Sequence, residues 1–523
     1  MKPHVGGTKD YLSGPKVYLV GAGPGDPGLI TVKGRKILER ADAVLYDHLA
    51  SQRLLDLAPA HAERVYVGKK RSAHEFSQDE ISRMLIERAS RGWTVVRLKG
   101  GDPFIFARGG EEIEALASAG IPFEIVPGVT TPLGLAAYTG VPLTHREHTS
   151  AVTFVTGHNV DAIDWGKVGA AETLVLFMGL VNFAAIARAL IERGRSPNTP
   201  AMAVRWATRP DQQTIAGTLE TLPALIEQAG LRPPATIVIG DVVSLRERFN
   251  WFEHLPLFGQ RIVVTRDRRQ AMDLVDPLEE LGAEALLAPV IEIRGPGDPG
   301  PLDQALTRLG SYDWLIFTSV NGVRFFLERL DRSAADLRAL RAKICAIGPA
   351  TRTAVEALHL KVDRMPEEYV AESLVAAFSA DDLTGRHILL PRAAVARDLV
   401  PVELTRRGAI VDVVEAYRTV VPETASLHVH DALERKPHWI TFTSSSTVKN
   451  FAAALEVIGT GVPGGELARI LAGIKIASIG PVTSATAREY GLTVDAEADP
   501  HTIDGLIAAI LEVRSPTETE PRP

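Results

Sequence analysis

Residues 17–46 read VYLVGAGPGDPGLITVKGRKILERADAVLY, and this stretch decides the fold class. An apolar run over residues 17–20 is followed by a glycine-rich turn, an amphipathic segment over residues 29–40 and a second apolar run over residues 43–46. Short buried strands that alternate with amphipathic helices are typical of α/β proteins. The same alternation continues along the chain, so the sequence predicts an α/β fold.

The glycine-rich turn over residues 21–25 lets the backbone approach a ligand closely, because glycine has no Cβ and accepts positive φ. A dinucleotide-binding fingerprint would need a third glycine at position 26, where this chain has Asp26. We therefore exclude a Rossmann dinucleotide site here. A purely structural turn remains the alternative to a ligand-binding loop.

Length and composition narrow the class of protein. A chain of 523 residues exceeds the usual single domain of about 150 residues. The net charge of −7 gives no global basic balance for nucleic acid or membranes. Cys345 is the single cysteine, which excludes a disulfide framework within the chain and nearly excludes a cysteine-based zinc site. We expect a cytoplasmic protein without a signal peptide or membrane span, with disordered ends at 1–14 and 515–523.

The second half of the sequence repeats itself with a period of about 126 residues. GQRIVVTRDRR from residue 259 aligns with GRHILLPRAAV from residue 385, and YDWLIFTSVNG from 312 aligns with PHWITFTSSST from 437. ICAIGPATRTA from 344 likewise aligns with IASIGPVTSAT from 476. The duplication predicts two similar lobes with a ligand cleft between them. The order of the matching pieces indicates that the chain crosses between the lobes.

Two further loops in the first half carry polar groups behind a strand. VVRLKGGDPFIFARGGEE from residue 95 places Asp102 after two glycines, where a carboxylate suits the hydroxyls of a ribose. VPGVTTPLG from residue 126 offers the hydroxyls of Thr130 and Thr131. An ordinary strand-to-helix turn is the alternative for each loop.

The segments GAGPGDPGLIT, YDHL, VGKK, LKGGDPFIFARGGEE, VPGVTTPLG and TLVLFMGL together closely resemble uroporphyrinogen-III C-methyltransferases. The resemblance covers residues 15–255 and implies a tetrapyrrole methylase fold of two α/β subdomains that bind S-adenosylmethionine between them. By resemblance, the cofactor contacts are Pro24, Gly100, Gly101, Asp102, Ile105, Thr130, Thr131, Met178 and Ala207. For Met178, packing in the hydrophobic core is the alternative to cofactor contact.

The chemistry of methyl transfer to a pyrrole carbon defines two further roles. The sulfonium charge disappears as the methyl group moves, so transfer depends on alignment. Loss of the ring N–H proton eases attack by carbon, so a general base helps. By resemblance, Asp47 is this base and Lys69 the proton donor. A helix cap over residues 48–54 is the alternative for Asp47, and a solvated side chain is the alternative for Lys69.

A substrate with eight carboxylates needs a basic lining, although the chain as a whole is acidic. Lys69, Lys70 and Arg71 form one candidate cluster, and Arg205 and Arg209 form another. Forked arginine–carboxylate hydrogen bonds would suit such a substrate.

The duplicated half resembles uroporphyrinogen-III synthases over residues 259–512. Its paired FTS and IGP loops each follow a strand and precede a helix, where backbone amides favour anions. The resemblance implies cyclisation of hydroxymethylbilane with loss of its hydroxyl and inversion of the last pyrrole. Tyr417 is the candidate for assisting departure of the hydroxyl, with a half-buried strand tyrosine as the alternative. Ser444, Ser445 and Thr483 are candidate substrate binders, with plain helix caps as the alternative.

Together the two resemblances predict a bifunctional enzyme that makes precorrin-2 for siroheme and cobalamin, because one half would supply the substrate of the other. A homodimer through the methylase half is implied by the resemblance. We expect no metal, since His145 with His148 is too sparse a ligand set. Two alternatives stay open: methylation of another corrinoid, and an inactive tetrapyrrole-binding module in the second half.

Overall fold

The computed structural model describes residues 16–68, 76–455 and 466–514. The predicted disordered ends, 1–14 and 515–523, lie outside these residues, as do Lys69, Lys70 and Arg71. The chain divides into two compact units. Unit 1 comprises Met1–Gln260 with Leu278–Glu284, and unit 2 comprises Arg261–Pro277 with Ala285–Pro523.

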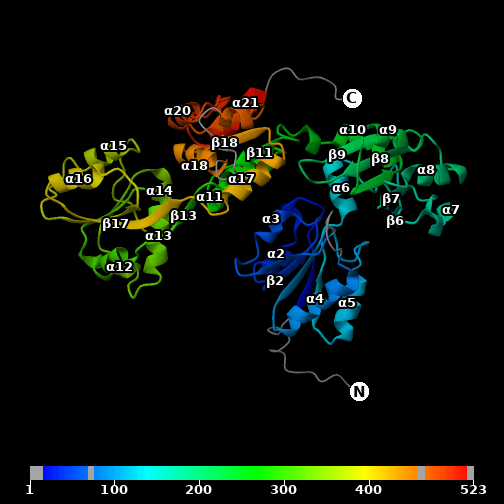
Figure 1. Cartoon of the computed structure of the whole chain (residues 1–523), viewed down its shortest axis with the longest axis horizontal. Coiled ribbons are helices and arrows are strands. Elements are labelled where there is room, and N and C mark those ends of the chain that lie inside the picture. The colour runs from blue at the N-terminus through cyan, green and yellow to red at the C-terminus, as the bar shows by residue number, and fades with distance from the viewer. Residues whose placement is uncertain (1–15, 69–75, 456–465, 515–523) are drawn as a thin grey trace. The chain divides into compact units, whose positions relative to one another are not determined.

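The first sheet of unit 1 is parallel throughout, in the order β3-β2-β4-β1-β5. Figure 1 labels β2 of this sheet and the helices α2, α3, α4 and α5 around it. All residues of β1 and β4 are buried, as expected for parallel strands covered on both faces. The strands are β1 (Val17–Gly21), β2 (Ala43–Tyr46), β3 (Glu63–Tyr66), β4 (Val95–Lys99) and β5 (Phe123–Val126). Around them lie η1 (Pro27–Leu29), α2 (Val32–Leu38), α3 (Gln52–Leu55), α4 (Gln78–Ser90) and α5 (Gly109–Ser118).

The second sheet of unit 1 is mixed, in the order β6-β7-β10-β8-β9. Only β6 and β7 pair in parallel; the other pairs are antiparallel. The strands are β6 (Val152–Thr156), β7 (Thr173–Phe177), β8 (Pro200–Arg205), β9 (Gln213–Thr218) and β10 (Ala235–Ile239). The helices are α6 (Thr131–Thr139), η2 (Val160–Ala162), α7 (Trp165–Val168), α8 (Phe183–Glu192), α9 (Leu222–Gln228), η3 (Asp241–Leu245), α10 (Arg246–Phe249) and η4 (Phe252–His254).

Unit 2 consists of two lobes, each built on one five-stranded sheet. The first lobe has the order β12-β11-β18-β19-β20, with strands β11 (Arg261–Val264), β12 (Glu284–Leu287), β18 (Trp439–Phe442), β19 (Lys475–Ser478) and β20 (Ala496–Glu497). Its helices are α11 (Arg268–Glu280), α17 (Ala425–Glu434), α18 (Ser445–Leu455), α19 (Glu466–Ile470), α20 (Pro481–Glu489) and α21 (Ile503–Arg514).

The second lobe has the order β13-β17-β16-β14-β15, and only β13 pairs antiparallel. Its strands are β13 (Glu292–Arg294), β14 (Trp314–Phe317), β15 (Lys343–Ala346), β16 (His387–Ala393) and β17 (Ile410–Val420). Its helices are α12 (Gly300–Thr307), η5 (Leu309–Ser311), α13 (Val320–Leu330), η6 (Leu337–Ala339), α14 (Pro349–Glu356), α15 (Ala371–Ala376) and α16 (Leu399–Arg406).

The strand orders explain the sequence repeat. The series β12-β11-β18-β19 of the first lobe corresponds, strand by strand, to β17-β16-β14-β15 of the second. Equivalent side chains even make the same contact: Ile344 donates its N–H to Asp363 Oδ2 at 2.7 Å, and Ile476 donates to Asp495 Oδ2 at 2.8 Å. The chain leaves the first lobe after β12 and returns before α17, so each lobe combines pieces of both repeats. The predicted crossing and the α/β fold class are confirmed.

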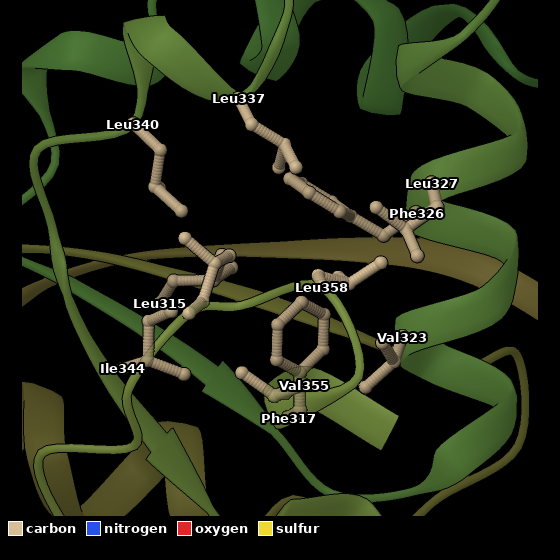
Figure 2. Close-up of a pocket in the computed structure, with 11 residues that line it drawn as sticks. Leu315, Phe317, Val323, Phe326, Leu327, Leu337, Leu340, Ile344, Val355 and Leu358 are labelled. Atoms are coloured by element: carbon tan, nitrogen blue, oxygen red, sulfur yellow. The ribbon is translucent and has the colours of Figure 1, made fainter. Parts of the chain in front are cut away.

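A cavity of about 10 Å³ lies in the core of the second lobe (Figure 2). Its volume suits no more than about one water molecule, and its lining side chains are all apolar. The cavity is therefore a packing gap and not a ligand site. The residues around it include Leu315, Phe317, Val323, Phe326, Ile344 and Val355.

Cys345 is fully buried in β15, and burial raises the pKa of its thiol to about 12. Because only the thiolate reacts with alkylating reagents, we expect no labelling of the native protein by iodoacetamide at neutral pH. Labelling should be complete in denaturant. Mass spectrometry of both samples checks this prediction, and rapid labelling of the native chain would contradict the buried position.

No helix among the described residues is long and apolar enough to cross a membrane.

Candidate active sites

Three glycines of unit 1 bring the loops after β1, β4 and β5 into contact. A Cβ on Gly21 would lie 2.5 Å from Gly128 Cα and 2.7 Å from Gly101 O, so neither backbone leaves room for a side chain. The loops are also hydrogen-bonded, since Gly101 donates its N–H to Gly23 O at 2.7 Å. The three predicted loops therefore form one surface at the carboxyl ends of adjacent parallel strands, the usual ligand edge of such sheets.

Asp102 stabilises this surface by accepting hydrogen bonds from the loop backbone. Its Oδ2 accepts the N–H of Gly128 at 3.0 Å, and its Oδ1 accepts the N–H of Phe104 at 2.8 Å. A carboxylate has about four acceptor positions, so two remain for ligand hydroxyls. The carboxylate thus has a structural role in the fold and retains acceptor capacity.

The turn over residues 24–26 packs against a loop from the second sheet. A Cβ on Gly25 would lie 3.0 Å from Ala207 O, and Asp26 donates its N–H to Thr208 Oγ1 at 2.9 Å. Asp26 Oδ2 accepts the hydroxyl of Tyr138, and burial together with this carboxylate raises the Tyr138 pKa. Pro24 and Ala207, predicted far apart in sequence as cofactor contacts, thus come from loops that touch.

The loop that contains Ile105 reaches the end of β7. The rings of Phe106 and Phe177 stand 4.8 Å apart, and Met178 directly follows Phe177. Met178 is 52% exposed, so its alternative role as a core residue is wrong. Phe104 is 51% exposed beside this loop, and an open apolar group of this kind suits a planar ligand.

Left-handed backbone gathers around the same loops. Among the described residues, seven non-glycine residues have positive φ, and five of them lie in these loops. Such backbone is costly for residues with a Cβ and is enriched at functional sites. The five are Phe106, Arg108, Met178, Trp206 and Thr208.

Thr130 and Thr131 begin α6, with Thr130 at the N-cap and 8% exposed. Thr131 lies against the glycine surface, with its Oγ1 3.4 Å from the position that a Gly101 Cβ would take. No described side chain caps the backbone amides of α6 at Thr130. Thr130 and Thr131 therefore lie at the start of α6, next to the glycine loop that contains Gly101.

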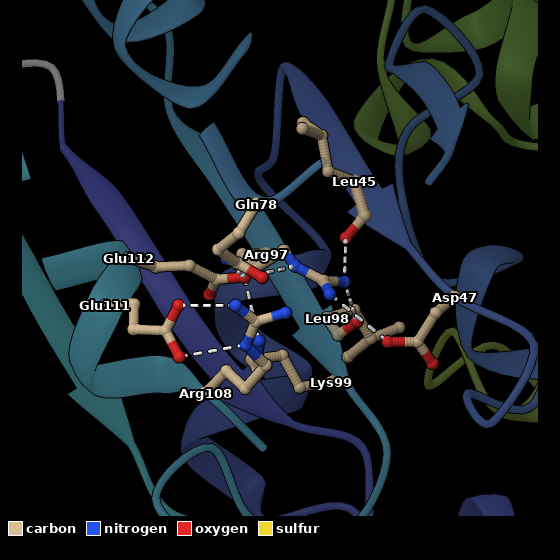
Figure 3. Close-up of polar contacts among 9 residues, drawn as sticks. All are labelled: Leu45, Asp47, Gln78, Arg97, Leu98, Lys99, Arg108, Glu111 and Glu112. Atoms are coloured by element: carbon tan, nitrogen blue, oxygen red, sulfur yellow. Dashed lines mark hydrogen bonds and ion pairs between the residues drawn. The ribbon is translucent and has the colours of Figure 1, made fainter. Parts of the chain in front are cut away.

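Asp47 is not a helix cap, because α3 begins later and has Ser51 at its N-cap. Asp47 instead follows β2 in a tight turn and accepts the N–H of Leu49 at Oδ1, 3.1 Å away. Its Oδ2 receives a hydrogen bond from Arg97 Nη2 at 3.2 Å, and its side chain is 20% exposed (Figure 3). A carboxylate at the edge of the sheet, held by a buried arginine, can accept a proton from a bound ligand.

Behind Asp47 lies a buried charge cluster, which we define as Arg97, Lys99 and Glu112 (Figure 3). Glu112 Oε1 accepts Arg97 Nε at 3.1 Å and Lys99 Nζ at 2.8 Å, and Gln78 adds a third donor at 3.0 Å. Burial opposes ionisation of Glu112, but Arg97 and Lys99 hold its pKa below the ordinary value. The cluster fixes the guanidinium that contacts Asp47.

Sequence reasoning missed this buried charge cluster. Arg97 and Lys99 alternate in an otherwise apolar buried strand, and both are at most 5% exposed. Two cations on one face of a buried strand require a buried carboxylate partner, and this signal could have found Glu112. Its neighbour Glu111 instead faces solvent, in a forked pair with Arg108 at 2.7 and 2.9 Å.

The basic residues predicted to face the substrate are only partly available. Arg209 forks onto Asp211 at 2.9 and 3.2 Å and lies 4.3 Å above the Trp206 ring. Arg205 has a buried Nε without a hydrogen-bond partner in the described part of the chain. His48, next to Asp47, meets Trp206 edge-on at 6.4 Å. The turn after Asp47 and the loop that carries Arg205, Trp206 and Arg209 therefore lie close together in unit 1.

In unit 2 the structure pairs Tyr417 with a residue that sequence reasoning did not single out. Tyr417 Oη and Ser319 Oγ are 3.0 Å apart, and Ser319 also caps α13 by accepting the N–H of Gly322. The Tyr417 ring stacks on Phe325 at 6.0 Å, so the tyrosine is half-buried as the alternative predicts. Ser319 is the repeat equivalent of Ser444, and the repeat alignment could have identified it.

Ser444, Ser445 and Thr483 lie in the first lobe, whereas Tyr417 lies in the second. Ser444 Oγ accepts the N–H of Thr447 at 3.3 Å, as a helix cap does. Ser445 donates to Val482 O at 3.3 Å and accepts from Thr486 at 3.0 Å, which joins the FTS loop to the IGP loop. Thr483 is 4% exposed at the start of α20.

Comparison with known proteins matches each half to a family. Residues 16–223 match the family described as Tetrapyrrole (Corrin/Porphyrin) Methylases. Residues 272–508 match the family described as Uroporphyrinogen-III synthase HemD. A porphyrin biosynthesis protein HemD of Ruminiclostridium josui is 35% identical over 507 residues, which cover 95% of this chain and 98% of that protein.

Other relatives match one half. A siroheme synthase of Pseudomonas aeruginosa is 48% identical over 257 residues, 48% of this chain and 55% of that enzyme. A uroporphyrin-III C-methyltransferase of Thermus thermophilus, solved with S-adenyl homocysteine, is 42% identical and covers 44% of this chain and 99% of its own, with a TM-score of 0.39. A mutant uroporphyrinogen III synthase of that species is 20% identical and covers 49% and 98%, with a TM-score of 0.37.

The protein is therefore a two-unit α/β enzyme of tetrapyrrole biosynthesis, with a methylase half and a synthase half. The chain belongs to the family of fusion proteins that join a tetrapyrrole methylase to a uroporphyrinogen-III synthase. The sequence-based resemblance to both families is confirmed.

Proposed function

We propose that the synthase half, residues 259–512, cyclises hydroxymethylbilane to uroporphyrinogen III with inversion of ring D. The methylase half, residues 15–255, then methylates this product at C2 and C7 with S-adenosylmethionine and yields precorrin-2 for siroheme and cobalamin. The observation that carries the proposal is the presence of both matched families on one chain. The product named for one half is the substrate named for the other.

S-adenosylmethionine is assigned to the glycine loops of unit 1. The relative from Thermus thermophilus that is 42% identical was solved with S-adenyl homocysteine, which supports this donor. The three glycine loops meet in one surface that has no side chain at Gly21, Gly101 and Gly128, and Asp102 retains acceptor positions for ribose hydroxyls. The proposed contacts are Pro24, Gly100, Gly101, Asp102, Ile105, Thr130, Thr131, Met178 and Ala207.

Asp47 is proposed as the general base. Its Oδ2 is held by Arg97, which orients the carboxylate, and its partial exposure leaves it accessible to a pyrrole N–H. When bound, S-adenosylmethionine supplies the methyl group; the protein orients the acceptor and removes the proton. Lys69 keeps its proposed role as proton donor from the resemblance alone.

In the synthase half, helix N-termini from both lobes are proposed to bind the substrate carboxylates. Ser444 and Ser445 stand at the start of α18, Thr483 at the start of α20 and Ser319 at the start of α13. Backbone amides at the N-termini of helices favour anions. Tyr417 is proposed to donate a hydrogen bond to the departing hydroxyl, with Ser319 fixing its phenol group.

The methylase assignment is tested by supplying uroporphyrinogen III and S-adenosylmethionine to the purified protein. We expect the mass of the product to rise by two methyl groups, with one and then two additions over time. A product that never gains a methyl group would contradict the assignment, whatever the synthase half does.

For the synthase half, we expect Tyr417→Phe to slow cyclisation about tenfold, below the 10²–10⁴-fold effect of a full general acid, because the hydroxyl leaves readily. Methylation of supplied uroporphyrinogen III should be unchanged. The matched control is Tyr490→Phe, a tyrosine that packs against the core of the other lobe. Chromatography that separates the type I and type III products gives the readout, and an unchanged rate would remove Tyr417 from the site.

A homodimer through the methylase half and a cytoplasmic location are also proposed. The dimer follows from the resemblance to the methylases, and the reduced, buried Cys345 is consistent with a reducing compartment. Light scattering of the full chain would contradict the dimer if it gave the mass of one chain.

A further inference from the structure

The segment between α6 and β6 of unit 1 holds side chains that the proposed chemistry does not use. His145, Glu147 and His148 each offer one ligand atom, and these atoms all lie within 4.8 Å of one another. The sequence-based expectation of no metal rests on two histidines alone. The fold adds a third ligand, the Glu147 carboxylate.

The backbone that carries these residues is fixed before any ion arrives. Thr149 donates its N–H to His145 O at 2.9 Å, His145 donates back to Thr149 O at 3.3 Å, and His148 donates to His145 O at 3.1 Å. Thr149 is 7% exposed, which anchors the end of the turn. The turn places the His145 and His148 rings side by side, with centroids 4.9 Å apart. Such preorganisation lowers the entropy loss on binding.

Most of the ligand atoms of His145, Glu147 and His148 are available to bind an ion. Within the described residues, neither the Glu147 carboxylate nor the His148 ring takes part in a hydrogen bond or an ion pair. His145 Nδ1 accepts the N–H of Glu147 at 3.2 Å. A neutral ring that accepts at Nδ1 carries its proton on Nε2, so binding an ion through Nε2 moves the proton to Nδ1 and breaks this long hydrogen bond.

We propose that His145, Glu147 and His148 bind one divalent transition-metal ion of the Zn²⁺, Co²⁺ and Ni²⁺ class. Two imidazole nitrogens and one carboxylate oxygen suit these ions, whereas Mg²⁺ and Ca²⁺ prefer all-oxygen ligands. Bonds of about 2.1 Å in a tetrahedron place the ligand atoms about 3.4 Å apart, so partly exposed side chains need to close by little more than an ångström. Water would complete the coordination.

The position of the site suggests its effect on the protein. The segment joins α6, which follows the first sheet, to β6 of the second sheet. An ion bound only in the folded state stabilises that state. We therefore expect the ion to stabilise the turn that carries His145, Glu147 and His148, within the segment that connects the two sheets.

The test uses the full chain without a histidine tag, stripped of metal by a chelator and then desalted. Loss of the single long hydrogen bond to His145 Nδ1 costs little free energy. Titration with Co²⁺, followed by its visible absorption, should therefore show one equivalent bound per chain with a Kd on the order of micromolar. Zn²⁺ should compete for the same equivalent and raise the Tm. Mg²⁺ should do neither.

Three variants decide the ligand set. Glu147→Gln and His148→Asn should each weaken Co²⁺ binding at least about tenfold, while leaving the Tm of the metal-free chain unchanged. His61→Asn is the matched control, because this exposed histidine lies in the same unit away from the cluster. Absence of Co²⁺ binding to the wild-type chain would overturn the proposal, and undiminished binding by either variant would overturn the three-ligand site.

Discussion

Replacing Asp47 by asparagine should lower the rate of methyl transfer by about 10²–10⁴-fold, the range expected for loss of a general base. The amide keeps the size of the side chain and its contact with Leu49, but it cannot take the pyrrole proton. Cyclisation of hydroxymethylbilane by the same chain should proceed at the wild-type rate, because that activity is assigned to the other half. The synthase activity is therefore an internal control for folding and concentration.

The readout is single-turnover methylation with radiolabelled S-adenosylmethionine, with uroporphyrinogen III in excess. Asp161→Asn, an exposed aspartate of the same unit, is the matched control and should retain wild-type methylation. Binding of the donor to Asp47→Asn should be unchanged, because Asp47 lies outside the proposed cofactor contacts. A variant with at least half the wild-type rate would show that the base lies elsewhere.

The second large effect concerns stability. Glu112→Gln should destabilise the methylase half by about 3–5 kcal/mol, because it leaves the buried Lys99 without its carboxylate partner and leaves the buried Arg97 with Asp47 alone. Glu111→Gln is the matched control, one position earlier on the same helix. Its pair with Arg108 faces solvent and is screened by water, so its loss should leave the free energy of unfolding nearly unchanged.

Urea unfolding of both variants, followed by circular dichroism and by loss of methylation, measures the difference. The native pKa of Glu112 is lowered, so its carboxylate contributes its full stabilisation above the unfolded pKa of about 4.3 and loses it only as the pH falls below that value, through the lowered native pKa. The gap between wild type and Glu112→Gln should therefore be full at pH 7 and shrink only below about pH 4. Equal stability of Glu112→Gln and Glu111→Gln at pH 7 would contradict the buried charge cluster.

Much of this architecture could be predicted because it depends on apolar runs, glycine-rich turns and an internal repeat, which are visible in the sequence. The apolar run at residues 43–46 became β2 without a shift, and the repeat in the second half predicted two lobes and a crossing chain. The glycine loops could be recognised because glycine, without a Cβ, allows two backbones to approach closely. At Gly21 the neighbouring backbone indeed leaves no room for a Cβ. These features depend on short segments or on internal similarity, both of which are visible in one sequence.

Contacts between distant side chains could not be predicted in the same way. Asp47 and Arg97 are fifty residues apart, and only the pairing of β2 with β4 brings them together. Tyr417 meets Ser319 across 98 positions, because β17 and β14 lie in the same sheet with only β16 between them. His145, Glu147 and His148 are close in sequence, yet only the closed turn shows that their ligand atoms converge.

The most direct test of the whole account gives the full chain hydroxymethylbilane as the only tetrapyrrole, with and without S-adenosylmethionine. We predict the type III ring without the donor, and the same ring with two added methyl groups when the donor is present. A type I ring would contradict the assignment of the synthase half. A type III ring that stays unmethylated with the donor would contradict the assignment of the methylase half.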